Sequence, residues 1–97
     1  MQAIHMTNHK GMISKNNILI KDSRGNVFLQ SYGEIVAIKH NGVIYIKESG
    51  KERSASTSRY IGYFIKDTIL EVEVLKDEEF IKMENEIWYI IEDMTAG

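Results

Sequence analysis

The chain has no cysteine and no proline, and none of its apolar runs is long. Without cysteine it can form no disulfide framework, no thiolate zinc site, no iron–sulfur cluster and no cysteine nucleophile. No run approaches the ~20 apolar residues of a membrane span, and residues 1–17 lack the apolar core of a signal peptide. We therefore expect one soluble intracellular domain over residues 1–97 with no membrane partner.

Sequence motifs of catalysis are also missing. The chain contains no G-x-S-x-G, no H-E-x-x-H, no phosphate loop of the G-x-x-x-x-G-K type and no dinucleotide fingerprint. His5 and His9 stand four residues apart, but no carboxylate motif joins them to His40 in a metal site. We expect a protein that is not an enzyme and holds neither a metal nor a cofactor.

Positive charge is scarce in the last third of the chain. Residues 67–97 carry ten acidic residues and two lysines, whereas residues 1–66 carry ten lysines or arginines and four acids. This asymmetry can steer a charged partner, or the two halves of the fold can face each other and cancel. The acidic residues that we expect to contact a partner are Glu71, Glu73, Glu78, Glu79, Glu86, Glu92 and Asp93.

The apolar residues favour a sheet, because isoleucine supplies 15 residues against four leucines and four alanines. Gly25 and Asn41-Gly42 each separate two β-rich runs, as in hairpins, and Tyr32-Gly33 forms the corner between them. The four predicted strands are 17–22, 27–31, 34–40 and 43–47. The sequence predicts an α+β fold built on a four- or five-stranded antiparallel meander, with both faces of the sheet covered.

Two helices and one more strand are predicted after the meander. Hydroxyl side chains before an apolar group at helical spacing indicate a short helix over about 57–66. Residues 68–75 read as a half-exposed strand with Leu70, Val72 and Val74 on its apolar face. Residues 77–94 read as an amphipathic helix capped by Asp77, with Trp88 on its buried apolar arc. A hairpin pairing 79–83 with 87–91 remains the alternative.

A second set of residues suggests an anion site at the start of the first predicted helix. A helix N-terminus offers free N–H groups and the positive end of the dipole, and nearby guanidinium groups would complete a phosphate site. The candidate residues are Arg24, Arg53, Ser56, Thr57, Ser58 and Arg59. Simple capping by a solvated loop is the alternative. Aromatic residues interleaved with cations would also suit single-stranded nucleic acid, unless they pack in the core.

Several short motifs in the first two thirds of the chain occur in a familiar order. They are D-S-R-G-N at 22–26, Q-S-Y at 30–32 and S-A-S-T-S-R-Y at 54–60. This order resembles a family of small uncharacterised domains encoded by phages and mobile elements of low-GC Gram-positive bacteria. The likeness covers 17–65; the chain departs from the pattern at Ala55-Ser56 and from residue 67 onward.

The resemblance implies the cytoplasm of a bacterial host cell and supplies no catalytic residue. Within the single domain we expect a flexible N-terminus over 1–16, a family-like core over 17–65 and an acidic strand and helix over 66–97. Our leading hypothesis is a phage-derived inhibitor that binds a host protein or nucleoprotein complex, such as a CRISPR-type defence, through its acidic surface. The alternatives are a nucleic-acid, nucleotide or phosphate binder and a self-associating module that forms a homodimer.

Overall fold

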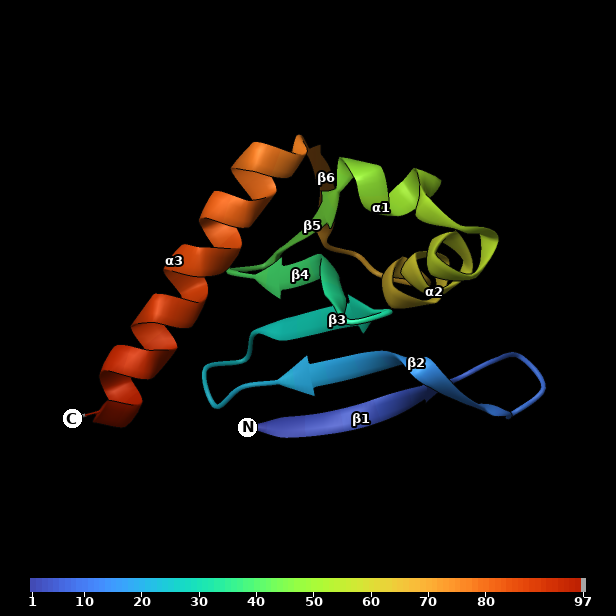
Figure 1. Ribbon diagram of the computed structural model, residues 1–97, viewed down its shortest axis with the longest axis horizontal. Helices are drawn as coiled ribbons and strands as arrows, with labels where there is room; N and C mark the ends of the chain where they lie inside the picture. The colour runs from blue at the N-terminus through green and yellow to red at the C-terminus, as the bar shows by residue number, and fades with distance from the viewer. Residues whose placement is uncertain (97) are drawn as a thin grey trace.

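The computed structural model describes the backbone of residues 1–96 and the side chains of residues 1–88. These residues form six strands and three helices (Figure 1). The strands are β1 (Gln2–Thr7), β2 (Ile13–Lys21), β3 (Val27–Ser31), β4 (Glu34–His40), β5 (Val43–Lys47) and β6 (Glu71–Leu75). The helices are α1 (Glu48–Arg53), α2 (Ala55–Ile65) and α3 (Asp77–Ala96).

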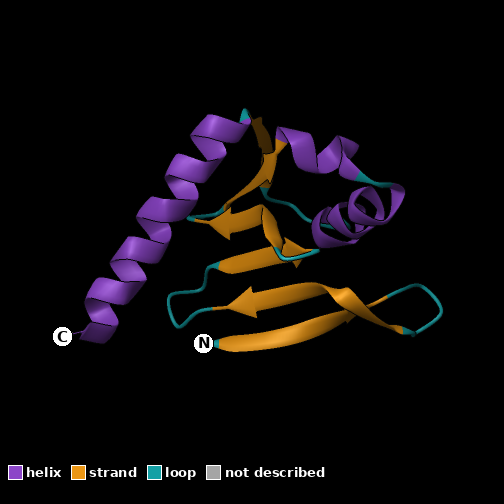
Figure 2. Ribbon diagram, in the orientation of Figure 1, coloured by secondary structure: helices purple, strands orange, loops and turns teal. Residues whose placement is uncertain are grey.

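All six strands belong to one sheet, in the same order as in the chain. The strands β1 to β5 form an antiparallel meander, and β6 pairs in parallel with β5. The expected four- or five-stranded antiparallel sheet is therefore only partly correct. A parallel neighbour needs a crossover rather than a hairpin, and α1 and α2 provide it between β5 and β6 (Figure 2).

The chain N-terminal to residue 17 contributes to the sheet. Gln2 pairs with Lys21 and Thr7 pairs with Ile13, so β1 is an edge strand and β2 begins earlier than the sequence predicts. The expectation of a flexible segment over 1–16 is wrong, because this segment supplies a whole strand and the start of the next. This strand was hard to predict from the sequence, because a strand that is exposed at nearly every position needs no buried apolar pattern.

Helices cover both faces of the sheet, as its apolar strands require. On one face, α1 and α2 cover a core cluster of Leu29, Val36, Ala37, Ile44, Ile46 and Ile61. On the other face, α3 covers Phe28 and Ile38 with its own Phe80 and Ile87. The strand β4 has a bulge at Val36, which is skipped in the pairing with β3. As a result, Val36 and Ala37 both pack in the core cluster under α1 and α2.

The C-terminal run forms a helix and not the alternative hairpin. Phe80 and Ile87 are buried against the sheet, while Trp88 is half-buried and stacks on Phe28 at a centroid distance of 4.7 Å. Ile81 is 43% exposed, so the buried face of α3 is narrower than the predicted apolar arc. Within residues 1–96, no helix is long and apolar enough to cross a membrane.

Candidate functional site

An acidic surface extends from β6 onto α3; we define it by Glu71, Glu73, Glu78, Glu79 and Glu86. All five side chains are exposed, and none forms an ion pair with another described residue. The strand and the helix are joined only by Lys76, so their acids are close in the chain as well as in space. Glu92 and Asp93, which were also expected here, have side chains outside the described residues.

The register of β6 places its acids on the α3 face of the sheet. Glu71 and Glu73 stand opposite Val43 and Tyr45 of β5, and Tyr45 packs in the cluster under α3. Neighbouring strand positions that are in register point to the same face. The acids of β6 therefore lie on the face from which α3 presents Glu78, Glu79 and Glu86.

The opposite face of β6 is apolar and accessible. Val72 and Val74 stand in register with the buried Ile44 and Ile46, but they are 38% and 48% exposed. Ile69, just before the strand, is 99% exposed. The sequence predicted a half-exposed strand with Val72 and Val74 on its apolar face, whereas both faces of β6 are exposed. The apolar face is open because β6 is the last strand of the sheet, beyond the main cover of α2.

The start of α3 is tied to the start of α1. The carboxylate of Asp77 accepts a hydrogen bond from the backbone N–H of Ser49 at 3.0 Å. The side chain and backbone of Ser49 together lower the pKa of Asp77, because they stabilise the charged form. Asp77 was predicted as a helix cap. The helical hydrogen bonds instead begin one residue earlier, where Phe80 donates to the Lys76 carbonyl.

A charged cluster lies where β4, β5, α1 and α3 meet. Lys47 and Arg53 both form ion pairs with Glu34, and Lys47 is buried. Glu84 of α3 lies near this cluster. Burial raises its pKa and the Glu34 carboxylate adds to the rise, although the Lys47 ammonium opposes it. Sequence analysis missed this cluster, and the one local signal was a lysine at the end of an apolar strand.

Arg24 lies apart from the other predicted anion residues, which are on or next to α2. The Ser31 hydroxyl lies 3.0 Å from the Thr57 hydroxyl, so Ser31 marks the end of β3 beside α2, whereas Arg24 precedes the opposite end. A five-residue strand separates its ends by about 13 Å. Arg53 is paired with Glu34, whereas Ser58 and Arg59 are exposed on α2. An anion bound at the start of α2 would therefore not reach Arg24.

Thr57 belongs to a buried hydrogen-bond network rather than to the surface. Its side chain is completely buried and accepts a hydrogen bond from the hydroxyl of Ser54, whose Oγ also caps α2 by accepting from the Thr57 N–H at 3.0 Å. Ser31 in turn donates to the buried Asn17 at 2.7 Å. This network joins α2 to β3 and β2. The half-buried Ser56 lies beside it in the first turn.

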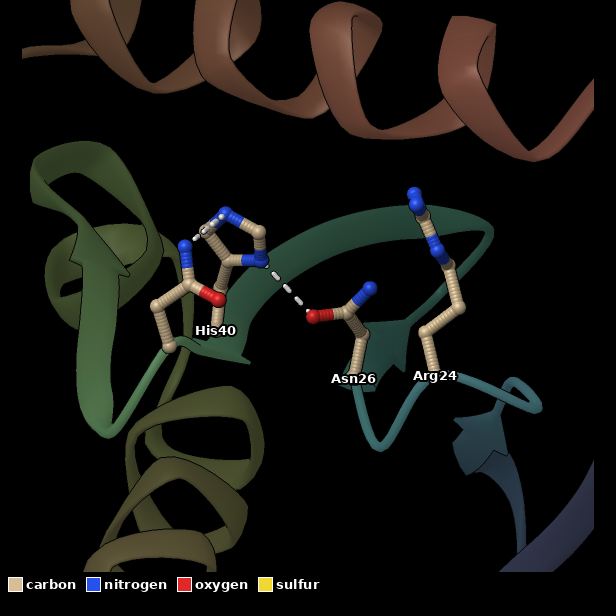
Figure 3. A pocket seen from close by; sticks show the side chains of 4 residues that line it. Arg24, Asn26 and His40 are labelled. Atoms are coloured by element: carbon tan, nitrogen blue, oxygen red, sulfur yellow. Dashed lines mark hydrogen bonds between the residues drawn. The ribbon is translucent and has the colours of Figure 1, made fainter. Parts of the chain in front are cut away.

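A polar cavity of about 350 Å³ lies where the β2–β3 and β4–β5 turns approach each other. Its lining includes Arg24, Asn26, His40 and Asn41 (Figure 3). Asn26 donates to the Asp22 carboxylate at 2.8 Å, which leaves its Oδ1 to accept from His40 Nδ1 at 2.7 Å. Nε2 of His40 then accepts from Asn41 at 3.1 Å, so the ring is fixed as the Nδ1–H tautomer.

The three histidines do not converge. His5 donates to the Ser14 carbonyl at 2.9 Å, His9 lies 3.3 Å from the Tyr63 hydroxyl, and His40 borders the cavity. Within residues 1–88, no three histidine or acidic side chains are grouped closely enough to hold a metal ion.

Comparison with known proteins gives a family and no function. A family model described as a family of unknown function (DUF8033) matches residues 1–83. No curated protein and no solved structure matches the chain. The match includes β1 to β6, α1, α2 and the first turns of α3, and so most of the acidic surface.

Proposed function

Since the chain belongs to the DUF8033 family, whose function is unknown, we propose its function from its surface. The protein is a non-enzymatic binder of a basic macromolecular partner, which it contacts through the acidic surface. The observation that carries this proposal is the exposure of five carboxylates on two consecutive elements, β6 and α3, on one side of the sheet.

The charge distribution of the fold supports this proposal. If the acidic third of the chain existed to neutralise the basic two thirds, its carboxylates would pair with lysines and arginines of the other strands. Instead, the two ion pairs among the described residues both use Glu34, which precedes the acidic third. Exposed charge of one sign accelerates association with an oppositely charged partner and selects against wrong ones.

A host protein or nucleoprotein complex with a basic channel is the partner that we propose. Carboxylates that a helix and a strand hold in place can occupy the basic channel in which the partner otherwise binds nucleic-acid phosphates. The resemblance of 17–65 to phage-encoded domains favours a bacterial partner and inhibition of a defence complex as the purpose.

Affinity capture with charge-reversed variants tests the proposal. The full chain is immobilised and exposed to a Gram-positive bacterial lysate at low salt, as are two variants. One carries Glu73→Lys, Glu78→Lys and Glu86→Lys; the matched control carries Lys15→Glu, Lys21→Glu and Lys39→Glu at exposed basic positions. We expect a partner that the first variant loses and the control retains. No partner, or equal capture by all three proteins, contradicts the proposal.

A second candidate function rests on the cavity beside Arg24. The Arg24 guanidinium and the Asn41 amide offer donors to a small anion such as a phosphate group. Titration with inorganic phosphate and with nucleotides should then shift the amide resonances of Gly25, Asn26 and Asn41. Arg24→Gln should abolish these shifts and Arg59→Gln should keep them. Shifts that survive in Arg24→Gln, or no shifts at all, would exclude this site.

A further inference from the structure

The outer edge of β6 is open. Among residues 1–96, β6 is hydrogen-bonded on one side only, to β5, and stands at the end of the sheet. A strand turns the N–H and C=O groups of alternate residues to its two sides, so part of the backbone of Glu71–Leu75 faces outward. The helix α3 does not cover this edge, because it runs from the end of β6 toward the β1 side of the sheet (Figure 1).

The two faces of β6 differ in chemistry right up to this edge. Glu71 and Glu73 are exposed on the α3 face, and Val72 and Val74 are exposed on the α2 face. A strand added beside β6 would place its own side chains alternately next to carboxylates and next to valines.

We propose that β6 binds an extended segment of the basic partner as an additional strand of the sheet. The segment alternates lysine or arginine with apolar residues, so that its cations lie beside Glu71 and Glu73 and its apolar side chains lie beside Val72 and Val74. Backbone hydrogen bonds provide affinity and the alternating side chains provide specificity. This inference rests on the proposed function and specifies how the partner is held.

A second copy of this chain fits the same edge poorly. If two β6 strands paired antiparallel about a twofold axis, the acids of one strand would face those of the other. Like charges on directly opposite strand positions destabilise a sheet. The register of β5 and β6 is regular, with no bulge to turn the edge away. The charge therefore disfavours self-pairing and favours a basic strand at this edge.

The test uses the full chain and a set of synthetic peptides. The parent peptide is acetyl-KVKVKVK-amide, and a second peptide has glutamate in place of every lysine. Two further versions of the parent carry backbone N-methyl groups, on the valines in one and on the lysines in the other. Binding is followed at low salt by the amide resonances of the ¹⁵N-labelled protein.

Strand addition predicts a specific pattern. The parent peptide should give saturable shifts centred on Glu71–Leu75, and the glutamate peptide should give none. Only alternate N–H groups of an added strand face β6, so one N-methylated peptide should lose binding while the other keeps it. Reversal of two exposed charges, Glu71→Lys with Glu73→Lys, should weaken the parent peptide about tenfold. The matched pair Glu78→Lys and Glu86→Lys on α3 should weaken it less than about threefold.

The outcomes separate this inference from the proposed function. Equal binding of both N-methylated peptides, or shifts centred on α3, would show that the acidic surface attracts cations without adding a strand. Concentration-dependent shifts at β6 without peptide would show that a second copy occupies the edge. Absence of binding by the parent peptide also overturns the inference. The proposed function itself is tested by the lysate capture, which does not depend on any of these peptides.

Discussion

At the scale of single residues, the hydroxyl groups of Thr57 and Ser31 belong to a buried hydrogen-bond network. Thr57 and Ser31 are completely buried, and their hydroxyl groups join α2 to the sheet through Asn17 and Ser54. Within residues 1–88, every buried polar side-chain atom has a hydrogen-bond partner. A buried polar group is costly only when it loses its partner, so this network specifies where α2 docks.

Replacement of Thr57 tests the network. Thr57→Val keeps the shape of the side chain and removes its hydroxyl, which leaves the buried Ser31 hydroxyl without its Thr57 partner. We expect the free energy of unfolding to fall by about 1–3 kcal/mol. Ser58→Ala, at an exposed position one residue on, should change it by less than about 0.5 kcal/mol. Urea denaturation measures both, and similar values for the two variants would contradict the assignment.

The pH dependence of stability tests the environment of Glu84. Burial raises the folded-state pKa of this carboxyl, so the fold prefers its protonated form. Its contribution to stability is fully present below the ordinary pKa of 4.5 and is lost as the pH rises through the raised value. Glu84→Gln should therefore stabilise the protein at neutral pH and have little effect well below pH 4.5. Glu86→Gln, on the exposed side of α3, is the control and should change the stability little at either pH. Destabilisation by Glu84→Gln at neutral pH would contradict a raised pKa of Glu84.

At the scale of elements, two helical glycines have different surroundings: Gly50 is closely packed and Gly62 borders open space. A Cβ atom on Gly50 of α1 would lie 3.0 Å from the Cβ atom of the buried Val36, in the bulge of β4. A Cβ atom on Gly62 of α2 would have no neighbouring atom within 4 Å. The bulge and Gly50 therefore let α1 approach the sheet closely.

Alanine at these two glycines should have opposite effects. Gly50→Ala should destabilise the protein by about 1–3 kcal/mol, because the added methyl group overpacks a full core. Gly62→Ala should stabilise it by up to about 1 kcal/mol, because alanine favours a helix. Thermal unfolding followed by circular dichroism compares the two. A stable Gly50→Ala protein would mean that α1 is not held against Val36.

The sequence predicted elements whose signals are local. The strands β3, β4 and β5 have the predicted bounds, since Asn41 and Gly42 adopt φ values of 50° and 79° in the hairpin turn that their types favour. The prediction also placed the start of α3 to within one residue. It missed α1, whose Ser49-Gly50 pair is a poor helix former. It also missed β1, whose place depends on pairing with β2 rather than on a pattern of its own.

The candidate sites depended more on tertiary structure than the elements did. Glu34, Lys47 and Glu84 come from three separate elements, and no spacing in the sequence links them. The acidic surface was predictable from composition, because it lies on two consecutive elements. The alternation of glutamate and valine predicted an acidic and an apolar side of β6, but which side faces α3 required the register with β5. Sequence alone could not show that Val72 and Val74 lie at an open edge.

At the scale of the whole molecule, ion pairs among the described residues do not neutralise the acids of the last third of the chain. The acids of β6 lie at one end of the strand order and β1 and β2 lie at the other, while α3 carries its acids from the β6 end toward the β1 side (Figure 1). Lys15 and Lys21 are exposed on β2. An arrangement of this kind orients the protein as it approaches a charged partner. The central claim is that the acidic end is the end that binds.

Amide hydrogen exchange of the full chain, alone and in complex with the partner captured from lysate, tests this claim most directly. Bound surfaces exchange more slowly, and the position of the protected amides does not depend on any substitution. We predict protection concentrated in β6 and in the exposed turns of α3 over 71–86. Protection concentrated in β1, β2 or the turn at Arg24, with unchanged exchange over 71–86, would contradict the claim.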